Sequence, residues 1–99
     1  MYVQMAYISR VRIEWDETKR TANLRKHGVD FADAVGALLD PHNLTREDDD
    51  ARGELRFITL GRGYCDRLLL VVWTERNEDV LRIISARKAS PAEARTYED

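Results

Sequence analysis

Residues 68–73 read Leu-Leu-Leu-Val-Val-Trp, an uninterrupted apolar run in a chain of 99 residues. A short apolar run bounded by polar residues is typical of a central strand that is buried on both faces. Arg67 precedes this run and Thr74 follows it. We therefore expect a strand over residues 67–74 at the centre of a sheet.

The sequence after this strand predicts one more strand and one helix. Residues 77–79 have turn-forming side chains, and residues 80–86 form the last strand. Ser90-Pro91-Ala92-Glu93 indicates a helix start, because serine is a common N-cap and proline suits the first helical position. The glutamate can bond back to the N-cap amide, which completes a capping box. We expect a short C-terminal helix from this point.

The sequence before the central strand predicts two further strands joined by tight turns. Gly61-Arg62-Gly63 indicates a turn that follows a strand over residues 54–60. A short strand is expected at residues 43–46, and the acid-rich segment 47–53 forms the turn between these two strands. Connections this short favour antiparallel hairpins.

Two helices are predicted in the first half of the chain. Asp16 is a candidate N-cap for a helix that Gly28 ends. Asp30 caps a second helix over residues 31–39, whose apolar residues recur at helical spacing. An Asp-Pro pair at positions 40 and 41 stops this helix.

The order of the elements predicts an α+β fold. Residues 11–15 alternate between apolar and polar, which is the period of a half-buried strand, and residues 1–9 are an unpatterned leader or an extra strand. We expect a small antiparallel β-sheet, with the two N-terminal helices and the short C-terminal helix packed on one face. The length suits a single domain over residues 1–99.

The charges of the chain are unevenly distributed, although the formal net charge is only −2. Segments 10–26 and 82–95 carry six and four basic residues against three and one acidic residues, whereas segment 46–54 carries five acidic against two basic. An RNA-binding protein needs basic side chains to contact phosphate. The two basic segments can supply them even though the net charge is slightly negative.

The composition also predicts the cellular compartment. The single cysteine, Cys65, excludes an internal disulfide and fits a reducing environment. No apolar run approaches the roughly 20 residues that span a bilayer, and the first residues do not have the pattern of a signal peptide. We expect a cytoplasmic protein.

Four sequence segments together resemble a known family. They are EWDETKRTANLRKHGVDF (14–31), the ED…RGELRFITLG region (47–61), LLLVVWTER (68–76) and RIISARKASPAEARTYE (82–98). In this order they are similar to the BrnT toxins, members of the wider RelE-like superfamily of small ribonucleases. The resemblance covers about residues 12–98.

The resemblance implies a fold, an activity and a partner. The fold is a sheet with helices on one face, and the activity is metal-independent cleavage of RNA. The partner is a BrnA antitoxin with a ribbon-helix-helix DNA-binding domain, and the toxin–antitoxin complex represses its own promoter. Promoter DNA is therefore reached only through the antitoxin.

Metal-free RNA cleavage needs a base for the 2′-hydroxyl, cations that stabilise the charged phosphate and an acid for the leaving oxygen. Arg87, in the family's Ser-Ala-Arg motif, is the first candidate for the phosphate, and the adjacent Lys88 is a candidate RNA contact. By strict alternation Arg87 falls on the apolar side of its strand, so it must emerge at an edge or a bulge. The alternative is a structural salt bridge to Glu54 or Glu75.

Three other candidates belong to the central strands. Arg76 is a second candidate phosphate ligand, and its alternative is an arginine in a solvated turn. Glu54 and Arg56 project to the same face of their strand. Glu54 is a candidate base and Arg56 a candidate RNA contact, but the two can equally form an exposed ion pair.

The remaining candidates lie on the helices. Lys26 and His27 end the first helix and are candidates for the acid and the base. Their alternative role is to neutralise the negative end of the helix dipole. Tyr97 is a candidate for stacking on a base, and more often such a tyrosine anchors its helix to the sheet.

The acidic segment does not predict a metal site. Asp48, Asp50 and Gly53 match positions 1, 3 and 6 of a calcium loop, but position 12 is Thr59 instead of glutamate. A solvated turn is the better interpretation, with a docking surface for a basic antitoxin segment as the second. We expect neither a metal nor a cofactor.

Two hypotheses on function remain open at this point. The enzyme hypothesis predicts that Arg87, Arg76 and Glu54 converge on one solvent-facing patch. The alternative is a catalytically silent binding module that acts only as a co-repressor with an antitoxin. Direct DNA binding by this chain is disfavoured, because the sequence has no helix-turn-helix pattern or basic recognition helix.

Overall fold

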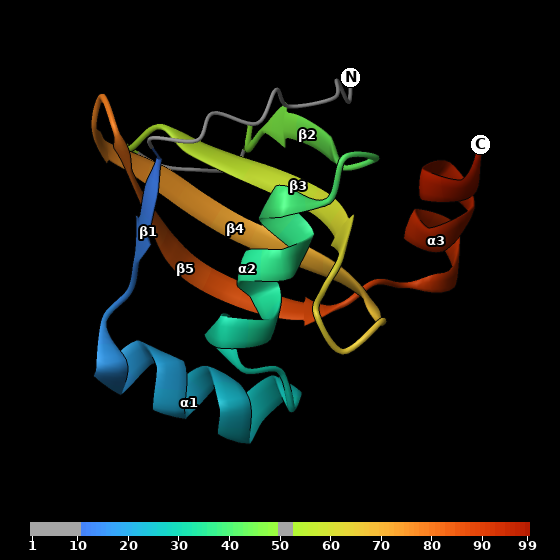
Figure 1. Cartoon of the computed structure of the whole chain (residues 1–99), viewed down its shortest axis with the longest axis horizontal. Helices are drawn as coiled ribbons and strands as arrows, with labels where there is room; N and C mark the ends of the chain where they lie inside the picture. Colours follow the sequence, from blue (N-terminus) through green and yellow to red (C-terminus); the bar gives the residue numbers. More distant parts are fainter. Residues whose placement is uncertain (1–10, 50–52) are drawn as a thin grey trace.

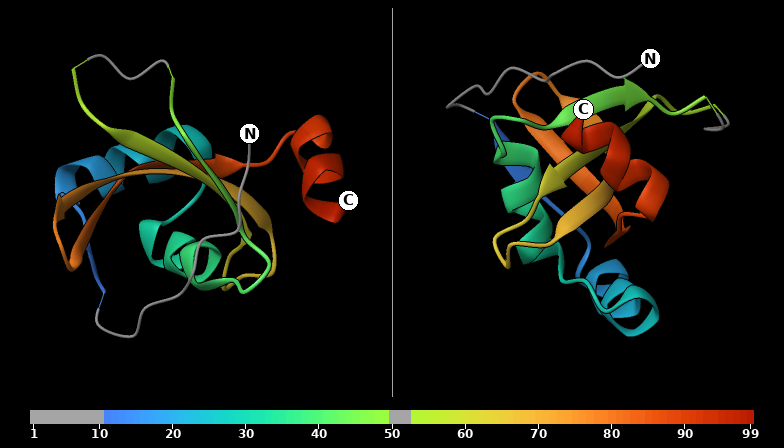
Figure 2. Two further views of the ribbon diagram at one scale, coloured as in Figure 1. Left: turned by 90° about the horizontal axis from the view of Figure 1, so that it is seen from above. Right: turned by 90° about the vertical axis from the view of Figure 1, so that its right-hand side faces the viewer.

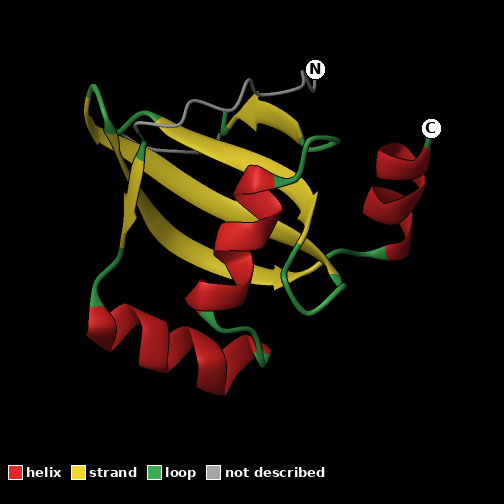
Figure 3. Cartoon of the chain, in the orientation of Figure 1, coloured by secondary structure: helices red, strands yellow, loops and turns green. Residues whose placement is uncertain are grey.

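The computed structural model describes residues 11–49 and 53–99, so the predictions for residues 1–9 and for Asp50 lie outside the described residues. The strands are β1 (Arg12–Glu14), β2 (Leu44–Glu47), β3 (Arg56–Arg62), β4 (Leu68–Asn77) and β5 (Val80–Lys88). The helices are α1 (Glu17–His27), α2 (Phe31–Leu39) and α3 (Pro91–Glu98). The order of the elements matches the α+β prediction (Figure 3).

The strands form a five-stranded sheet in the order β1-β5-β4-β3-β2 (Figure 1). Neighbouring strands from β2 to β5 are antiparallel, as the tight turns predict. The prediction of a wholly antiparallel sheet was wrong for β1, which pairs with β5 in parallel. Most of the chain lies between β1 and β5. A connection of this length allows β5 to run in the same direction as β1.

The helix α2 packs against one face of the sheet, whereas α1 lies at the edge of β5. α2 crosses one face, inside the curve of the strands (Figure 2). Its Phe31, Ala34 and Leu38 join a buried core with alternate residues of β4, among them Val71 and Trp73. Gly61 of β3 permits the close approach of α2, because a Cβ there would lie 2.2 Å from the carbonyl oxygen of Ala37. The face that α2 covers is called the α2 face below.

A buried asparagine attaches α1 to the outer edge of β5. Asn23 Nδ2 donates to the carbonyl oxygens of Val29 and Ala86, and its Oδ1 accepts from the Ala86 N–H. Since β1 pairs only with the stretch of β5 from Val80 to Arg82, Asn23 covers a part of this edge that β1 does not reach. The attachment places the C-terminal turn of α1 beside β5.

The helix α3 packs on the opposite face of the sheet. Tyr97 and Ala89 contact a smaller cluster formed by Ile58, Leu60 and Leu70. The expectation that all three helices share one face was therefore wrong. The apolar run of β4 explains the outcome, because its alternate residues are buried on both faces and each face needs a cover.

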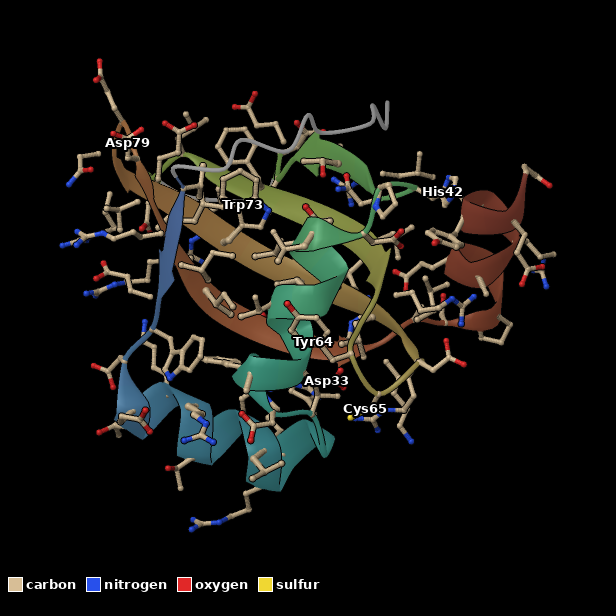
Figure 4. All side chains as sticks on the ribbon, in the orientation of Figure 1. Asp33, His42, Tyr64, Cys65, Trp73 and Asp79 are labelled. Carbon is tan, nitrogen blue, oxygen red and sulfur yellow. The ribbon has the colours of Figure 1, made fainter. Side chains whose placement is uncertain are left out.

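A buried aspartate connects α2 to the hairpin between β3 and β4. Asp33 Oδ1 accepts from the Cys65 N–H at 2.8 Å, and Arg67 Nη2 donates to Asp33 Oδ2 at 3.2 Å. Figure 4 shows Asp33 beside the loop that carries Cys65. These contacts hold the hairpin against the helix.

Local signals predicted the helix limits, whereas the strand limits differ from the prediction. β1 is shorter than predicted, and β3 begins at Arg56, so the prediction that Glu54 belongs to this strand was wrong. Asp16, Asp30 and Ser90 cap the three helices with their side chains, and Gly28 ends α1 in the left-handed conformation at φ 70°. The strands β3, β4 and β5 run two or three residues past the predicted ends, to Arg62, Asn77 and Lys88. Pairing between strands continues through polar residues that the apolar pattern does not include.

Candidate active site

A bulge in β5 determines where the side chain of Arg87 points. Trp73 pairs with Ile83 and Val72 pairs with Ser85, so one residue of β5 is extra at this point. Arg87 then pairs with Leu70, whose side chain lies on the face opposite α2. Arg87 therefore leaves the apolar side through a bulge, which is one of the outcomes that its position in the sequence predicts.

A groove runs between α1 and β5 beside this bulge. It has a volume of about 280 Å³, and its lining includes Lys19, Lys26 and His27 from the helix and Ile84 and Ser85 from the strand. The structure thus brings the two candidates from α1 next to the Ser-Ala-Arg motif. Bulges are frequent beside active sites, where they redirect a side chain.

Lys26 and His27 occupy the last turn of α1, where basic residues also interact favourably with the helix dipole. Lys26 is exposed and His27 is partly buried. Both predicted roles are therefore compatible with the geometry. Their place in the groove adds an observation that the dipole alone does not explain.

The carboxylate of Glu93, on the first turn of α3, holds the guanidinium group of Arg87. Arg87 Nη1 and Nη2 donate to the two oxygens of Glu93 at 2.8 and 2.9 Å, and Nη1 also donates to the Lys88 carbonyl oxygen. The alternative prediction of a salt bridge from Arg87 to Glu54 or Glu75 was wrong, because in the described residues the salt bridge is to Glu93. The Arg87 side chain is still 41% exposed.

Glu93 also closes the predicted capping box at the start of α3. Its Oε1 accepts from the Ser90 N–H at 2.8 Å, and its own N–H donates to Ser90 Oγ. The hydrogen bonds from Arg87 lower the pKa of Glu93 from 4.5 to about 2 against the opposing effect of burial. The carboxylate is therefore charged throughout the physiological range.

The hydroxyl of Tyr97 attaches the other end of α3 by donating to Asp40 Oδ2 at 2.5 Å. Asp40 also accepts from the backbone N–H groups of Arg62 and His42. Burial alone would raise the pKa of Asp40, but these hydrogen bonds outweigh it and keep the pKa below its ordinary value. Of the two roles predicted for Tyr97, the geometry supports that of an anchor.

Glu54 and Arg76 lie at the other end of the sheet. They line a second groove of about 450 Å³ together with Leu55, Thr74, Glu75, Asn77 and Glu78. Arg56 donates to Glu54 at 3.0 and 3.1 Å in an ion pair that is exposed on both sides. Arg76 lies 4.0 Å from Glu14.

The predicted convergence of Arg87, Arg76 and Glu54 was wrong. Arg87 pairs with Leu70, and Arg76 lies six positions further along β4 than Leu70. At about 3.3 Å per residue the two arginines start ~20 Å apart along the strand. They share a sheet but cannot contact the same phosphate.

Lys88 points to the opposite face from Arg87, because it pairs with Leu69 of the α2 core.

The structure also identifies residues that the sequence did not suggest for the site, namely Ser85, Asn23, Asp40 and the partner role of Glu93. The capping-box signal had identified Glu93 as a helix residue only. A polar residue such as Asn23 on a helix gives no local sign of burial.

Two further observations concern metals and membranes. Within residues 11–49 and 53–99, no three His, Cys, Asp or Glu side chains gather as they would around a metal ion. No helix in this part of the chain has the length and apolar character needed to cross a membrane.

A small sheet with an arginine anchored by Glu93 on β5, and a basic groove lined by Ser85 of the same strand, suits a protein that acts on phosphodiesters. Comparison with known families makes the class specific, because residues 15–93 match the model described as ribonuclease toxin, BrnT, of type II toxin-antitoxin system. The chain belongs to this family. It is a ribonuclease toxin of a toxin–antitoxin system, as the resemblance of residues 12–98 predicted.

A solved structure agrees with this assignment. The chain is similar to the crystal structure of the Brucella abortus ribonuclease toxin BrnT, with 29% sequence identity and a TM-score of 0.60. The match covers 81% of this chain and 97% of the Brucella chain. No curated protein sequence matches the chain.

Proposed function

We propose that this ribonuclease toxin cuts RNA at the groove between α1 and β5, with Arg87 stabilising the phosphate in the transition state. The observation that carries the proposal is the position of Arg87. The bulge turns its side chain out of the α2 core, Glu93 holds it, and 41% of it remains exposed. Arg87 does not itself line the groove, but it lies two residues along β5 from Ser85, which does. A planar guanidinium group in this setting suits two phosphate oxygens.

The groove supplies candidates for the proton transfers. Lys26 and His27 line it together with Ser85. One of the two would remove the proton from the 2′-hydroxyl and the other would protonate the leaving 5′-oxygen. The 2′-oxygen then attacks the phosphorus and the bond to the 5′-oxygen breaks, which leaves a cyclic phosphate on one product.

The other predicted residues take supporting roles in this proposal. Along the strands, Arg76 lies about 20 Å from Arg87, and Arg56 lies about 13 Å from it and two strands across the sheet. Both arginines would therefore contact the RNA away from the cut. Glu54 would orient Arg56 through the observed ion pair. Lys88 would add a phosphate contact at the end of β5, and Tyr97 would hold α3 in place.

Metal independence is also part of the proposal. Cationic side chains can supply the charge that a metal ion would otherwise bring to the phosphate. Since a chelator removes metals without changing these side chains, cleavage in its presence tests this point directly.

The family implies an antitoxin partner. We propose that this partner is a BrnA-like protein with a ribbon-helix-helix domain, and that it alone contacts promoter DNA. The toxin would act in the cytoplasm, where its RNA substrate is, and so inhibit translation and growth.

RNA cleavage by the purified chain in EDTA tests the function, with Arg87→Ala as the variant and Arg25→Ala, an exposed arginine of α1, as the control. We expect cleavage by the wild type and the control and its loss in Arg87→Ala. Equal cleavage by all three would contradict the role of Arg87. If none cuts, growth arrest on expression in a bacterium separates a ribosome-dependent enzyme from a silent co-repressor.

A further inference from the structure

We propose that Glu93 is a positioning residue for RNA cleavage and sets the orientation of the Arg87 guanidinium group. This inference rests on the proposed function, because it assigns a role relative to Arg87. Glu93 itself need not touch the RNA. It acts by restricting the arginine to one geometry before the substrate binds.

The contact between the two residues has the geometry that such a role needs. The two terminal nitrogens of the Arg87 guanidinium group, Nη1 and Nη2, donate to separate oxygens of Glu93 at 2.8 and 2.9 Å. A bidentate pair fixes the plane of the guanidinium group as well as its position. Without it, a long arginine side chain samples several rotamers, and misplacement by about 1 Å can cost about 100-fold in rate.

The surroundings of Glu93 argue against a carboxylate that merely competes with phosphate. Its carboxylate accepts a hydrogen bond from the Ser90 N–H at the first turn of α3. The helix dipole stabilises a negative charge at this position. Its side chain is 23% exposed, against 41% for Arg87. The carboxylate therefore lies on the protein side of the pair, and the arginine is the member that solvent and substrate reach.

The attachment of α3 explains how Glu93 is itself held. No residue of α3 is buried, so apolar packing alone does not fix the helix. Its N-terminal turn is held by the Glu93–Arg87 pair and its C-terminal turn by the hydrogen bond from Tyr97 to Asp40. With both ends attached, α3 is a rigid support for the arginine.

Three variants separate this role from the structural roles of α3. Glu93→Ala removes both the contact with Arg87 and the capping-box acceptor. Glu93→Gln keeps an N3 side chain that can complete a capping box but removes the charge. Ser90→Ala removes the N-cap hydroxyl and leaves the Glu93 carboxylate in place. Glu98→Gln, an exposed carboxyl on the same helix, controls for the change in net charge.

The first readout is the split between kcat and KM for a short RNA. We expect Glu93→Ala to lower kcat about 10–100-fold while KM changes less than about threefold, because ground-state binding is largely kept. Glu93→Gln should fall between Glu93→Ala and the wild type. Ser90→Ala and Glu98→Gln should keep kcat within about twofold of the wild type.

The second readout is the NMR signal of the Arg87 side chain, which does not depend on cleavage. Separate Nη signals are expected in the wild type and in Ser90→Ala, because the bidentate pair hinders rotation. They should average in Glu93→Ala. If Glu93→Ala does not fold, the comparison of Glu93→Gln with Glu98→Gln still gives both readouts.

The possible results have distinct meanings. Wild-type cleavage rates in both Glu93 variants, beside an inactive Arg87→Ala, would overturn the role of Glu93 and leave the proposed function intact. Faster cleavage in Glu93→Ala would also overturn it, by showing that the carboxylate competes with phosphate. A wild-type chain that cuts no RNA and stops no growth would overturn the proposed function and the role of Glu93 together.

Discussion

The side-chain amide of Asn23 on α1 makes both backbone hydrogen bonds of Ala86 on β5. Its Nδ2 donates to the carbonyl oxygen at 2.8 Å, and its Oδ1 accepts from the N–H at 3.1 Å. The amide thus takes the place of a neighbouring strand on the part of β5 that β1 does not reach. It also sets α1 beside β5, and therefore Lys26 and His27 beside the bulge.

Asn23→Ala should destabilise the protein by about 2–4 kcal/mol, because it leaves more than one buried backbone group without its partner. Urea denaturation followed by circular dichroism measures this change. Thr21→Ala, at an exposed position of the same helix, is the control and should change the free energy of unfolding by less than about 0.5 kcal/mol. A similar effect of both variants would contradict the role of Asn23 as a strand substitute.

Substitutions in the groove between α1 and β5 should affect the kinetics differently from substitutions in the second groove, at the other end of the sheet. A Lys26→Ala/His27→Ala double variant should lose about 100-fold or more in kcat, as expected for loss of general acid–base catalysis. Glu54→Gln and Arg76→Ala should mainly raise KM, since both residues line the second groove, at the other end of the sheet from Arg87. Steady-state kinetics on one short RNA decide the matter. A loss of kcat in Glu54→Gln as large as that in the Lys26→Ala/His27→Ala variant would show that the active site is at the second groove.

Acid should weaken the fold partly through Glu93. Its pKa is lowered from 4.5 to about 2 in the folded chain, chiefly by the hydrogen bonds from Arg87, so the unfolded chain binds more protons between these values. The stabilisation is complete above pH 4.5 and is lost as the pH falls toward 2. Glu93→Gln should therefore lose less stability than the wild type between pH 7 and pH 3 in urea titrations.

Asp30 serves as an internal reference for this measurement. Its pKa is likewise lowered to about 2, mainly by the hydrogen bonds from Arg20, and this contribution is present in both proteins. The difference between wild type and Glu93→Gln thus isolates Glu93. Identical acid sensitivity of the two would show that the pair with Arg87 does not stabilise the fold.

Tyr97→Phe should loosen the C-terminal end of α3. It removes the hydrogen bond to the charged Asp40, a loss of about 1.5–3 kcal/mol for a bond of this kind. Hydrogen exchange of the α3 amides should become faster while exchange in β4 stays slow. Tyr64→Phe removes the hydroxyl of a tyrosine that is 67% exposed and should change neither. Unchanged exchange in α3 would show that Asp40 is not its anchor.

The acidic turn after β2 should matter more for the antitoxin than for RNA. Asp49→Lys reverses the charge of an exposed residue in this turn, so it should weaken binding to a basic antitoxin segment, with a smaller effect on cleavage. Calorimetry with the antitoxin and the RNA assay give the two numbers. Glu98→Lys makes the same charge change on α3 as a control. Equal losses of binding and cleavage in Asp49→Lys would exclude a docking role for the turn.

The sequence by itself determined the helices and the central strand. Asp16, Gly28 and Asp30 act on backbone groups within a few residues of themselves, and the capping box of Ser90 and Glu93 does the same. Such signals can be interpreted without knowing the rest of the chain. The run at 68–73 needed only its composition to indicate a strand covered on both faces, and the family followed from motifs that keep their order.

Only the tertiary structure decided the arrangement of the candidate site. The bulge that turns Arg87 away from the α2 core depends on the register between β4 and β5. The parallel pairing of β1 and the attachment of α1 through Asn23 join residues more than 60 positions apart. The separation of Arg87 from Arg76 follows from the same register. The physical reason is that contacts between distant segments depend on packing of the whole sheet, which no local pattern of residues encodes.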